Sequence, residues 1–238
     1  MIAPPNSSSA TMTSALAHTM HALEAARGMD KDLSAEQRDA MGTDHDALAA
    51  HLEKVAQAEG ALERFRLVEG ARLQARVTVG DDALDRGVRA AKARMRLELR
   101  RTALPAGADR VFGDDLEGLV DADLRLEPTR VLEAVARFAD VPDFPGKAEM
   151  LTDLRDRAER QQAALVERDA GDVTEAGLKS TLVHAVADAS LVLYQLEKRL
   201  LERFPRQRSY VGLFFLRAGR GGKRPASPEP AAKAPAVP

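Results

Sequence analysis

An apolar stripe with helical spacing runs through the C-terminal third of the chain. Its members are separated by four and three residues in turn: Leu178, Leu182, Ala185, Ala189, Val192 and Leu196. In an α-helix of about 3.6 residues per turn, this spacing places every member on one side. The pattern therefore predicts a long amphipathic helix over about 173–204, ended by Pro205. It excludes a β-strand, whose side chains alternate with a period of two.

The composition agrees with closely packed helices. Hydrophobic residues make up 45% of the 238 residues, but aromatic residues only 4%, and the chain has no tryptophan. A core built from Leu, Val and Ala suits helices that pack at short distances better than it suits a β-sandwich. We expect an all-α fold.

Two stretches of the chain share a similar order of signals. Gly80-Asp81 opens a helical stretch that closes at Leu104-Pro105, and Gly171-Asp172 opens another that closes at Phe204-Pro205. Glycine interrupts a helix, aspartate caps its start, and proline stops it. The order predicts two helical hairpins and permits an internal duplication, although capping signals alone explain it equally well. It leaves open whether the helices turn at Gly80 and Gly171 or run through them.

These signals together predict an antiparallel four-helix bundle of two hairpins, preceded by an extra N-terminal helix. A helix is expected from about Thr11 to Gly28, a capping box at Ser34 and Gln37, and a short helical turn over 129–139 behind Pro128. The expected boundaries are disorder over 1–10, a bundle domain over 11–216, hairpins over about 44–104 and 147–204, a connector over 105–146, a capping segment over 205–216, and a disordered tail over 217–238.

Two further apolar stripes define the expected first hairpin. The first contains Leu48, Leu52, Val55, Leu62, Phe65 and Val68, and the second contains Leu84, Val88, Ala91, Met95 and Leu99. Each has the three- and four-residue spacing of a helix with one buried side.

Charge and cysteine content exclude several classes of function. A formal net charge of −2 gives no general reason to expect nucleic acid or an anionic membrane as a partner. The absence of cysteine excludes disulfides, thiolate metal sites and a cysteine nucleophile. No signal peptide is recognisable at Met1, and no stretch has the run of apolar residues of a membrane span. We expect a cytoplasmic protein, and the preference for arginine over lysine suggests a bacterial one.

The histidines offer the only evident catalytic or metal-binding candidates. His18 and His21 lie three residues apart, and His184 and Asp188 four apart, so each pair shares a helix face. No histidine has a glutamate three residues before it, as a di-iron bundle requires. We interpret these residues as solvated helix faces and expect no catalytic residue, metal or cofactor. A metal or small-ligand site in the bundle core remains an alternative.

A basic helix precedes an acidic segment. Its basic residues are Arg86, Arg89, Lys92, Arg94, Arg96, Arg100 and Arg101, and the acidic residues are Asp114, Asp115, Glu117, Asp121, Asp123 and Glu127. The basic residues could contact nucleic acid or another polyanion. They lie all around the helix, without aromatic residues for base stacking, so we expect instead that the acidic segment neutralises them.

The densest apolar cluster lies just behind Pro205. Its candidate contact residues are Val211, Leu213, Phe214, Phe215 and Leu216. It could cap the bundle core or dock a partner. With no enzyme motif present, we expect a non-enzymatic protein that acts through protein contacts or self-association. Coiled-coil packing of its helices is the expected mode of contact. A weak polyanion binder is the alternative.

Overall fold

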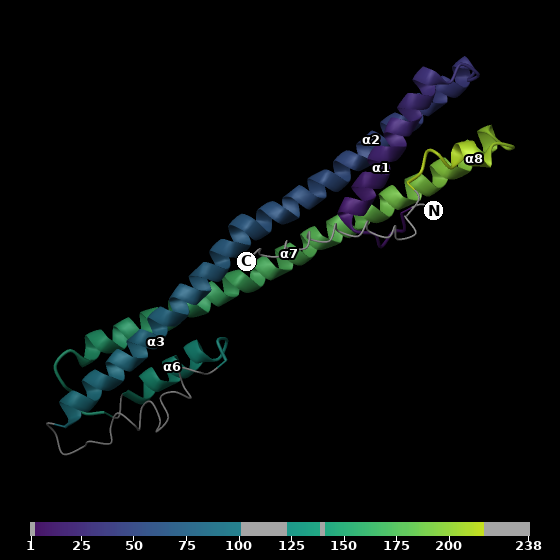
Figure 1. The fold of residues 1–238 in the computed structure, drawn as a ribbon. Helices are drawn as coiled ribbons and strands as arrows, with labels where there is room; N and C mark the ends of the chain where they lie inside the picture. Colours follow the sequence, from purple (N-terminus) through teal and green to yellow (C-terminus); the bar gives the residue numbers. More distant parts are fainter. Residues whose placement is uncertain (1–2, 101–122, 139–140, 217–238) are drawn as a thin grey trace, which may run out of the picture. The chain divides into compact units, whose positions relative to one another are not determined.

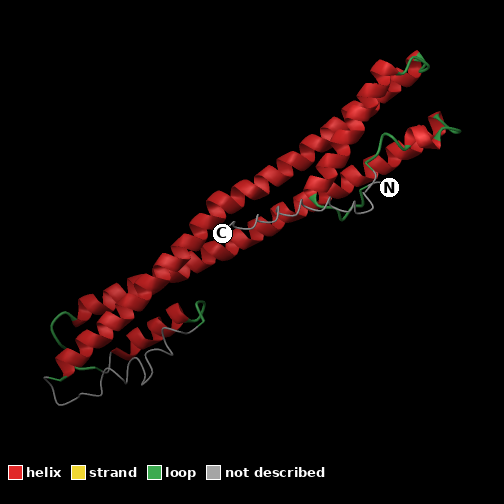
Figure 2. Ribbon diagram, viewed as in Figure 1, coloured by secondary structure: helices red, strands yellow, loops and turns green. Residues whose placement is uncertain are grey.

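The computed structural model describes residues 3–100, 123–138 and 141–216 of the chain (Figure 1). Every regular element in these ranges is helical, and none of their residues lies in a strand (Figure 2). The expected all-α fold is confirmed. The elements are α1 (Ser9–Met29), α2 (Ala35–Arg64), the π-helix η1 (Phe65–Gly70), α3 (Ala71–Leu99), α6 (Glu127–Arg137), α7 (Lys147–Arg203) and α8 (Arg208–Val211).

Several helix ends follow the signals in the sequence. Ser34 accepts a hydrogen bond from the Gln37 backbone N–H, and the Gln37 side chain accepts one from the Ser34 backbone N–H, as predicted for a capping box. Pro128 stands in the first turn of α6, where its missing N–H costs nothing. Gly146, which ends the breaker before α7, has a positive φ of 75° that favours glycine.

The two predicted hairpin turns are wrong, because the helices continue through their glycines. α3 runs through Gly80, and α7 runs through Gly171 without a break. A Cβ at position 80 would overlap the Gln161 side chain, and one at position 171 would overlap Leu73. The glycines therefore let two helices approach closely, and their intrinsic cost of about 1 kcal/mol is too small to end a long packed helix.

The helices α3 and α7 run antiparallel. Gly80 faces Gln161, and further along α3 Gly87 faces Arg157, so partner numbers on α7 fall as those on α3 rise. At Gly87 a Cβ would lie 2.7 Å from Arg157 Cδ, which again indicates close packing. The two helices thus form one antiparallel pair in place of two separate hairpins.

The chain divides into two compact units, and α7 contributes to both. Unit 1 comprises the residues up to Glu59 and those from Leu182, and unit 2 comprises Gly60–Thr181. The two units are described separately below.

Unit 1 packs α1, the first part of α2 and the last part of α7 around one core. The predicted stripe of α7 faces this core from Leu182 onward, with Ala189 and Leu196 fully buried, whereas Leu178 belongs to unit 2. The segment after Pro205 closes the same core through its aromatic residues. The buried residues are Met12, Ala15, Leu16, Leu23, Leu33, Met41, Leu48, Val55, Val186, Ala189, Leu193, Leu196, Leu200, Phe204, Val211, Phe214 and Phe215.

Unit 2 has its main core where α6 packs against α3 and α7. The predicted α3 stripe lies in this core, which consists of Leu84, Val88, Ala91, Met95, Leu99, Val131, Ala134, Val135, Phe138, Val141, Met150, Leu154 and Ala158. A smaller cluster of Val77, Ala164 and Leu165, with Leu124 against it, lies closer to η1.

One residue of the expected first-hairpin stripe departs from its predicted position. Val68 is exposed, whereas Leu62 in the turn before η1 is buried. Residues in a π-helix advance by a smaller angle than those in an α-helix, so the apolar phase that holds through α2 is lost within η1. No signal in the sequence marks this change.

Candidate interaction surface

The basic residues of α3 are largely engaged within unit 2. Arg86 pairs with Asp82 at 2.7 Å, and Arg89 pairs with Asp85 at 3.4 Å, each one turn away on the same helix. Arg94 donates to the Pro145 carbonyl oxygen at 3.0 Å. Among the described residues, Arg86 and Arg89 are therefore paired by carboxylates of their own helix and not by the acidic segment that was predicted to neutralise them.

The other residues that were predicted to contact a polyanion differ in burial and in their partners. Lys92 is buried, Arg96 is engaged in an interaction, and Arg100 is exposed at the end of α3. Arg101 and most of the acidic segment, Asp114 to Asp121, lie outside the described residues. Arg86, Arg89, Arg94 and Arg96 are exposed, as is Arg100.

The segment 211–216 belongs mainly to the core of unit 1. Val211, Phe214 and Phe215 are buried there, whereas Leu213 is 65% exposed and Leu216 is also open to solvent. The Tyr210 and Phe214 rings meet edge to face, with centroids 5.3 Å apart. The aromatic residues therefore cap the core, and only two leucines of this segment are available to a partner.

The histidine pairs do not converge on a common centre. His18 Nε2 lies 3.2 Å from the Leu213 carbonyl oxygen, while the exposed His21 faces Glu24 at 3.6 Å. Burial, and then the charge of Lys54, lowers the pKa of His51, while the charge of Asp188 acts in the opposite direction. Within the described ranges, no group of three His, Asp or Glu side chains is arranged to hold a metal ion.

A buried acidic group lies where α6 meets α3. Glu127, at the start of α6, is only 1% exposed, and its Oε1 atom has no hydrogen-bond partner. Burial, followed by the adjacent carboxyl groups of Asp85 and Asp81, raises the pKa of Glu127 to about 9. At neutral pH this side chain is protonated, so it contributes no charge to unit 2.

Unit 2 exposes an apolar stripe on α7. Its members follow one another at intervals of three and four residues: Ala163, Val166, Ala170, Val173 and Gly177. Val166 is 65% exposed and Val173 is 74% exposed. On a helix of about 100° per residue, the stripe lies roughly opposite the side that faces α3. This spacing is that of a coiled-coil seam, yet it faces solvent.

A groove between α3 and α7 adjoins this stripe at Ala163. Ala75 and Val79 of α3 line this groove with Ala163 and Ala164 of α7, and the groove has a volume of about 650 Å³. Val79 is itself 66% exposed. We define the apolar face as the α7 stripe itself: Ala163, Val166, Ala170, Val173 and Gly177. Sequence reasoning missed it, although it has a regular three-four spacing.

Arginines border the groove, and each has an acidic partner. The four pairs are Arg72 with Glu69, Arg76 with Glu167, Arg157 with Asp153, and Arg160 with Asp156. The border therefore carries equal numbers of positive and negative charges. Such a border favours a partner surface with equal numbers of positive and negative charges over a surface with a high net charge.

One described helix, α7, is long and apolar enough to cross a membrane by length and composition. The core helix of a soluble protein meets the same criterion, so this is weak evidence. Comparison with family models, curated proteins and solved structures gives no match for this chain.

Proposed function

We propose that this chain is a non-enzymatic, self-associating helical module, and that the apolar face of unit 2 binds the same face of a second copy. The observation that carries the proposal is the exposure of Val166 and Val173, seven residues apart on α7. A seam with this spacing is filled by another helix with matching spacing, which a second copy supplies.

The charge pairs that border the adjoining groove favour a second copy as the occupant. A polyanion would meet the acidic members of the border pairs, and a basic partner would meet the arginines. A second copy related by a two-fold axis places its own border, which has equal numbers of positive and negative charges, against the border of the first. The small alanines allow the helices of the two copies to approach closely.

In the resulting dimer, α7 of one copy packs against α7 of the other, and each α3 lies on the far side of its own α7. A face from Ala163 to Gly177 is about 21 Å long. Because the contact is this short, we expect dimer formation to depend on the protein concentration.

Sedimentation velocity over a range of protein concentrations tests the proposal. The wild-type chain is expected to move from monomer to dimer as its concentration rises. Val166→Glu combined with Val173→Glu would place four like charges in the contact, and the variant is expected to stay monomeric. Since both valines are exposed, the monomer should keep its helix content in circular dichroism.

A matched control lies on the same helix. Val183 and Leu191 of α7 are exposed but belong to unit 1, so Val183→Glu with Leu191→Glu is expected to dimerise like the wild type. A wild-type chain that remains monomeric at every concentration would refute self-association. Loss of the dimer in the control variant as well would remove the assignment to this face.

A further inference from the structure

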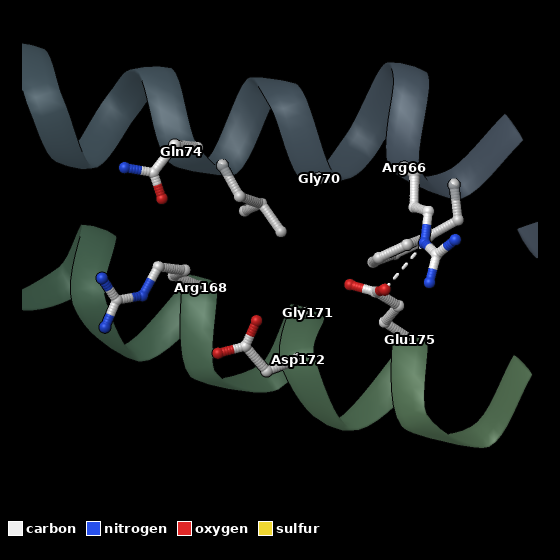
Figure 3. A pocket seen from close by; sticks show the side chains of 9 residues that line it. Arg66, Gly70, Gln74, Arg168, Gly171, Asp172 and Glu175 are labelled. Carbon is white, nitrogen blue, oxygen red and sulfur yellow. Dashed lines mark hydrogen bonds and ion pairs between the residues drawn. The ribbon is translucent and has the colours of Figure 1, made fainter. Parts of the chain in front are cut away.

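A second, smaller cavity lies where η1 and the start of α3 face α7. It has a volume of about 240 Å³, and Gly70 and Gly171 face each other across it (Figure 3). Phe65 and Leu73 reach toward Gly171, and a side chain at position 171 would overlap Leu73. The cavity thus has an apolar middle and lies beside a π-helix, a local distortion often found at functional sites.

One end of the cavity is closed by a satisfied ion pair. Arg66 Nε donates to Glu175 Oε1 at 2.8 Å (Figure 3). Lys179 Nζ lies 2.9 Å from the same oxygen. Hydrogen bonding from Lys179 and then Arg66 lowers the pKa of Glu175. This carboxylate already has its partners and needs no ligand.

The other end is lined by Gln74, Arg168 and the exposed Asp172 (Figure 3). Gln74 already donates to Thr78 Oγ1 at 3.4 Å. The Arg168 Nε atom is buried without a hydrogen-bond partner, although Nη2 of the same group lies 3.6 Å from Asp169. The Asp172 carboxylate pairs with none of the described residues. A buried donor without a partner costs about 1–3 kcal/mol, which a bound acceptor would recover.

The balance of charge restricts the class of ligand. Arg66 and Arg168 are offset by Asp172 and Glu175, so the lining has no net charge. A phosphate would meet the two carboxylates, whereas a neutral zwitterion could use both an unpaired donor and an unpaired acceptor. The volume is below the range of about 300–1,000 Å³ that is typical of drug-sized ligands.

We propose that this cavity binds a free α-amino acid with an apolar side chain of about the size of leucine. The ligand carboxylate accepts from Arg168, and its ammonium group donates to Asp172. The ligand side chain packs on Leu73 and Phe65. This site lies apart from the exposed stripe of α7 that is assigned to the dimer contact.

Isothermal titration calorimetry of the full chain with L-leucine tests the site. Saturable binding is expected, together with a rise in melting temperature. Two analogues isolate the charged groups: 4-methylpentanoate lacks the ammonium group, and 3-methylbutylamine lacks the carboxylate. Each is expected to bind at least about tenfold more weakly, because one charged partner in the site is left unpaired.

Variants locate the binding in the cavity. Asp172→Asn and Arg168→Gln are each expected to weaken leucine binding at least about tenfold, while Glu159→Gln, an exposed position on the same helix, leaves it unchanged. The absence of binding by the wild-type chain at millimolar leucine would overturn the proposal. Equal binding by wild type and Asp172→Asn, or equal binding of leucine and 4-methylpentanoate, would also overturn it.

Discussion

The carboxylate of Asp44 accepts two hydrogen bonds from the guanidinium group of Arg199, at 2.8 and 3.2 Å, across 155 positions of the sequence. Its other oxygen accepts from Arg203 at 2.6 Å. Asp44 is buried, and its two partners lie one turn apart on α7. This network fixes α2 against α7 within unit 1.

Replacing Asp44 by alanine should destabilise unit 1 by about 1–3 kcal/mol. The change leaves two guanidinium groups without their acceptor, and both are only partly screened by solvent. Urea unfolding followed by circular dichroism measures the effect. Asp46→Ala is the control, since Asp46 is exposed and contacts only His45, and a loss of stability equal to that of Asp44→Ala would contradict the prediction.

Gly171→Ala should destabilise unit 2, whereas Gly60→Ala should stabilise it. The new Cβ at position 171 overlaps buried Leu73, and such overpacking costs about 1–3 kcal/mol. At Gly60 nothing lies within 4 Å, so only the gain in helix propensity of about 1 kcal/mol remains. Thermal unfolding of both variants measures the difference, and a higher melting temperature for Gly171→Ala would refute the close approach of α3 and α7.

Gly80 and Gly171 show which features of the fold could be predicted from the sequence alone. Local signals predicted the capping box at Ser34, the start of α6 at Pro128 and the end of α7 before Pro205, because each acts within one helical turn. Gly80 and Gly171 look like helix breakers by the same local criteria. Their actual environment depends on a helix about 80–100 residues away, which the local pattern does not contain.

The candidate surface was hidden for a related reason. The spacing from Ala163 to Gly177 can be read from the sequence, but a stripe of this kind is ordinarily expected to face the core. Only the packing of α3 on the opposite side of α7 shows that Val166 and Val173 are exposed. Conversely, Phe214 and Phe215 suggested a docking site from composition, yet they are buried in unit 1.

Glu127 should make the stability of unit 2 fall as pH rises. Its pKa is about 9 in the folded chain and 4.5 in the reference state, so the folded chain binds more protons between these values. The stabilisation is therefore full below about pH 4.5 and is lost as pH rises toward 9. Glu127→Gln removes this dependence and should be more stable than wild type at pH 7 by about 1–3 kcal/mol.

Urea unfolding at several pH values between about 4.5 and 9 checks the effect of Glu127. Glu133→Gln, an exposed position on the same helix, should follow the wild-type pH dependence. If Glu127→Gln and wild type showed parallel curves, the side chain would be ionised in the folded chain, and the raised pKa would be refuted.

Phe214→Ala should lower the stability of unit 1 by about 3 kcal/mol without preventing dimer formation. The ring is buried and packs edge to face on Tyr210, whose hydroxyl donates to Asp30 at 2.9 Å. Its removal leaves a cavity in the core.

Leu213→Ala is the neighbouring control and should change stability by less than about 0.5 kcal/mol, because Leu213 is mostly exposed. Urea unfolding gives the stability, and sedimentation velocity of the folded variant gives the association state. A Phe214→Ala chain that kept full stability but lost the dimer would return the contact surface to the 211–216 segment.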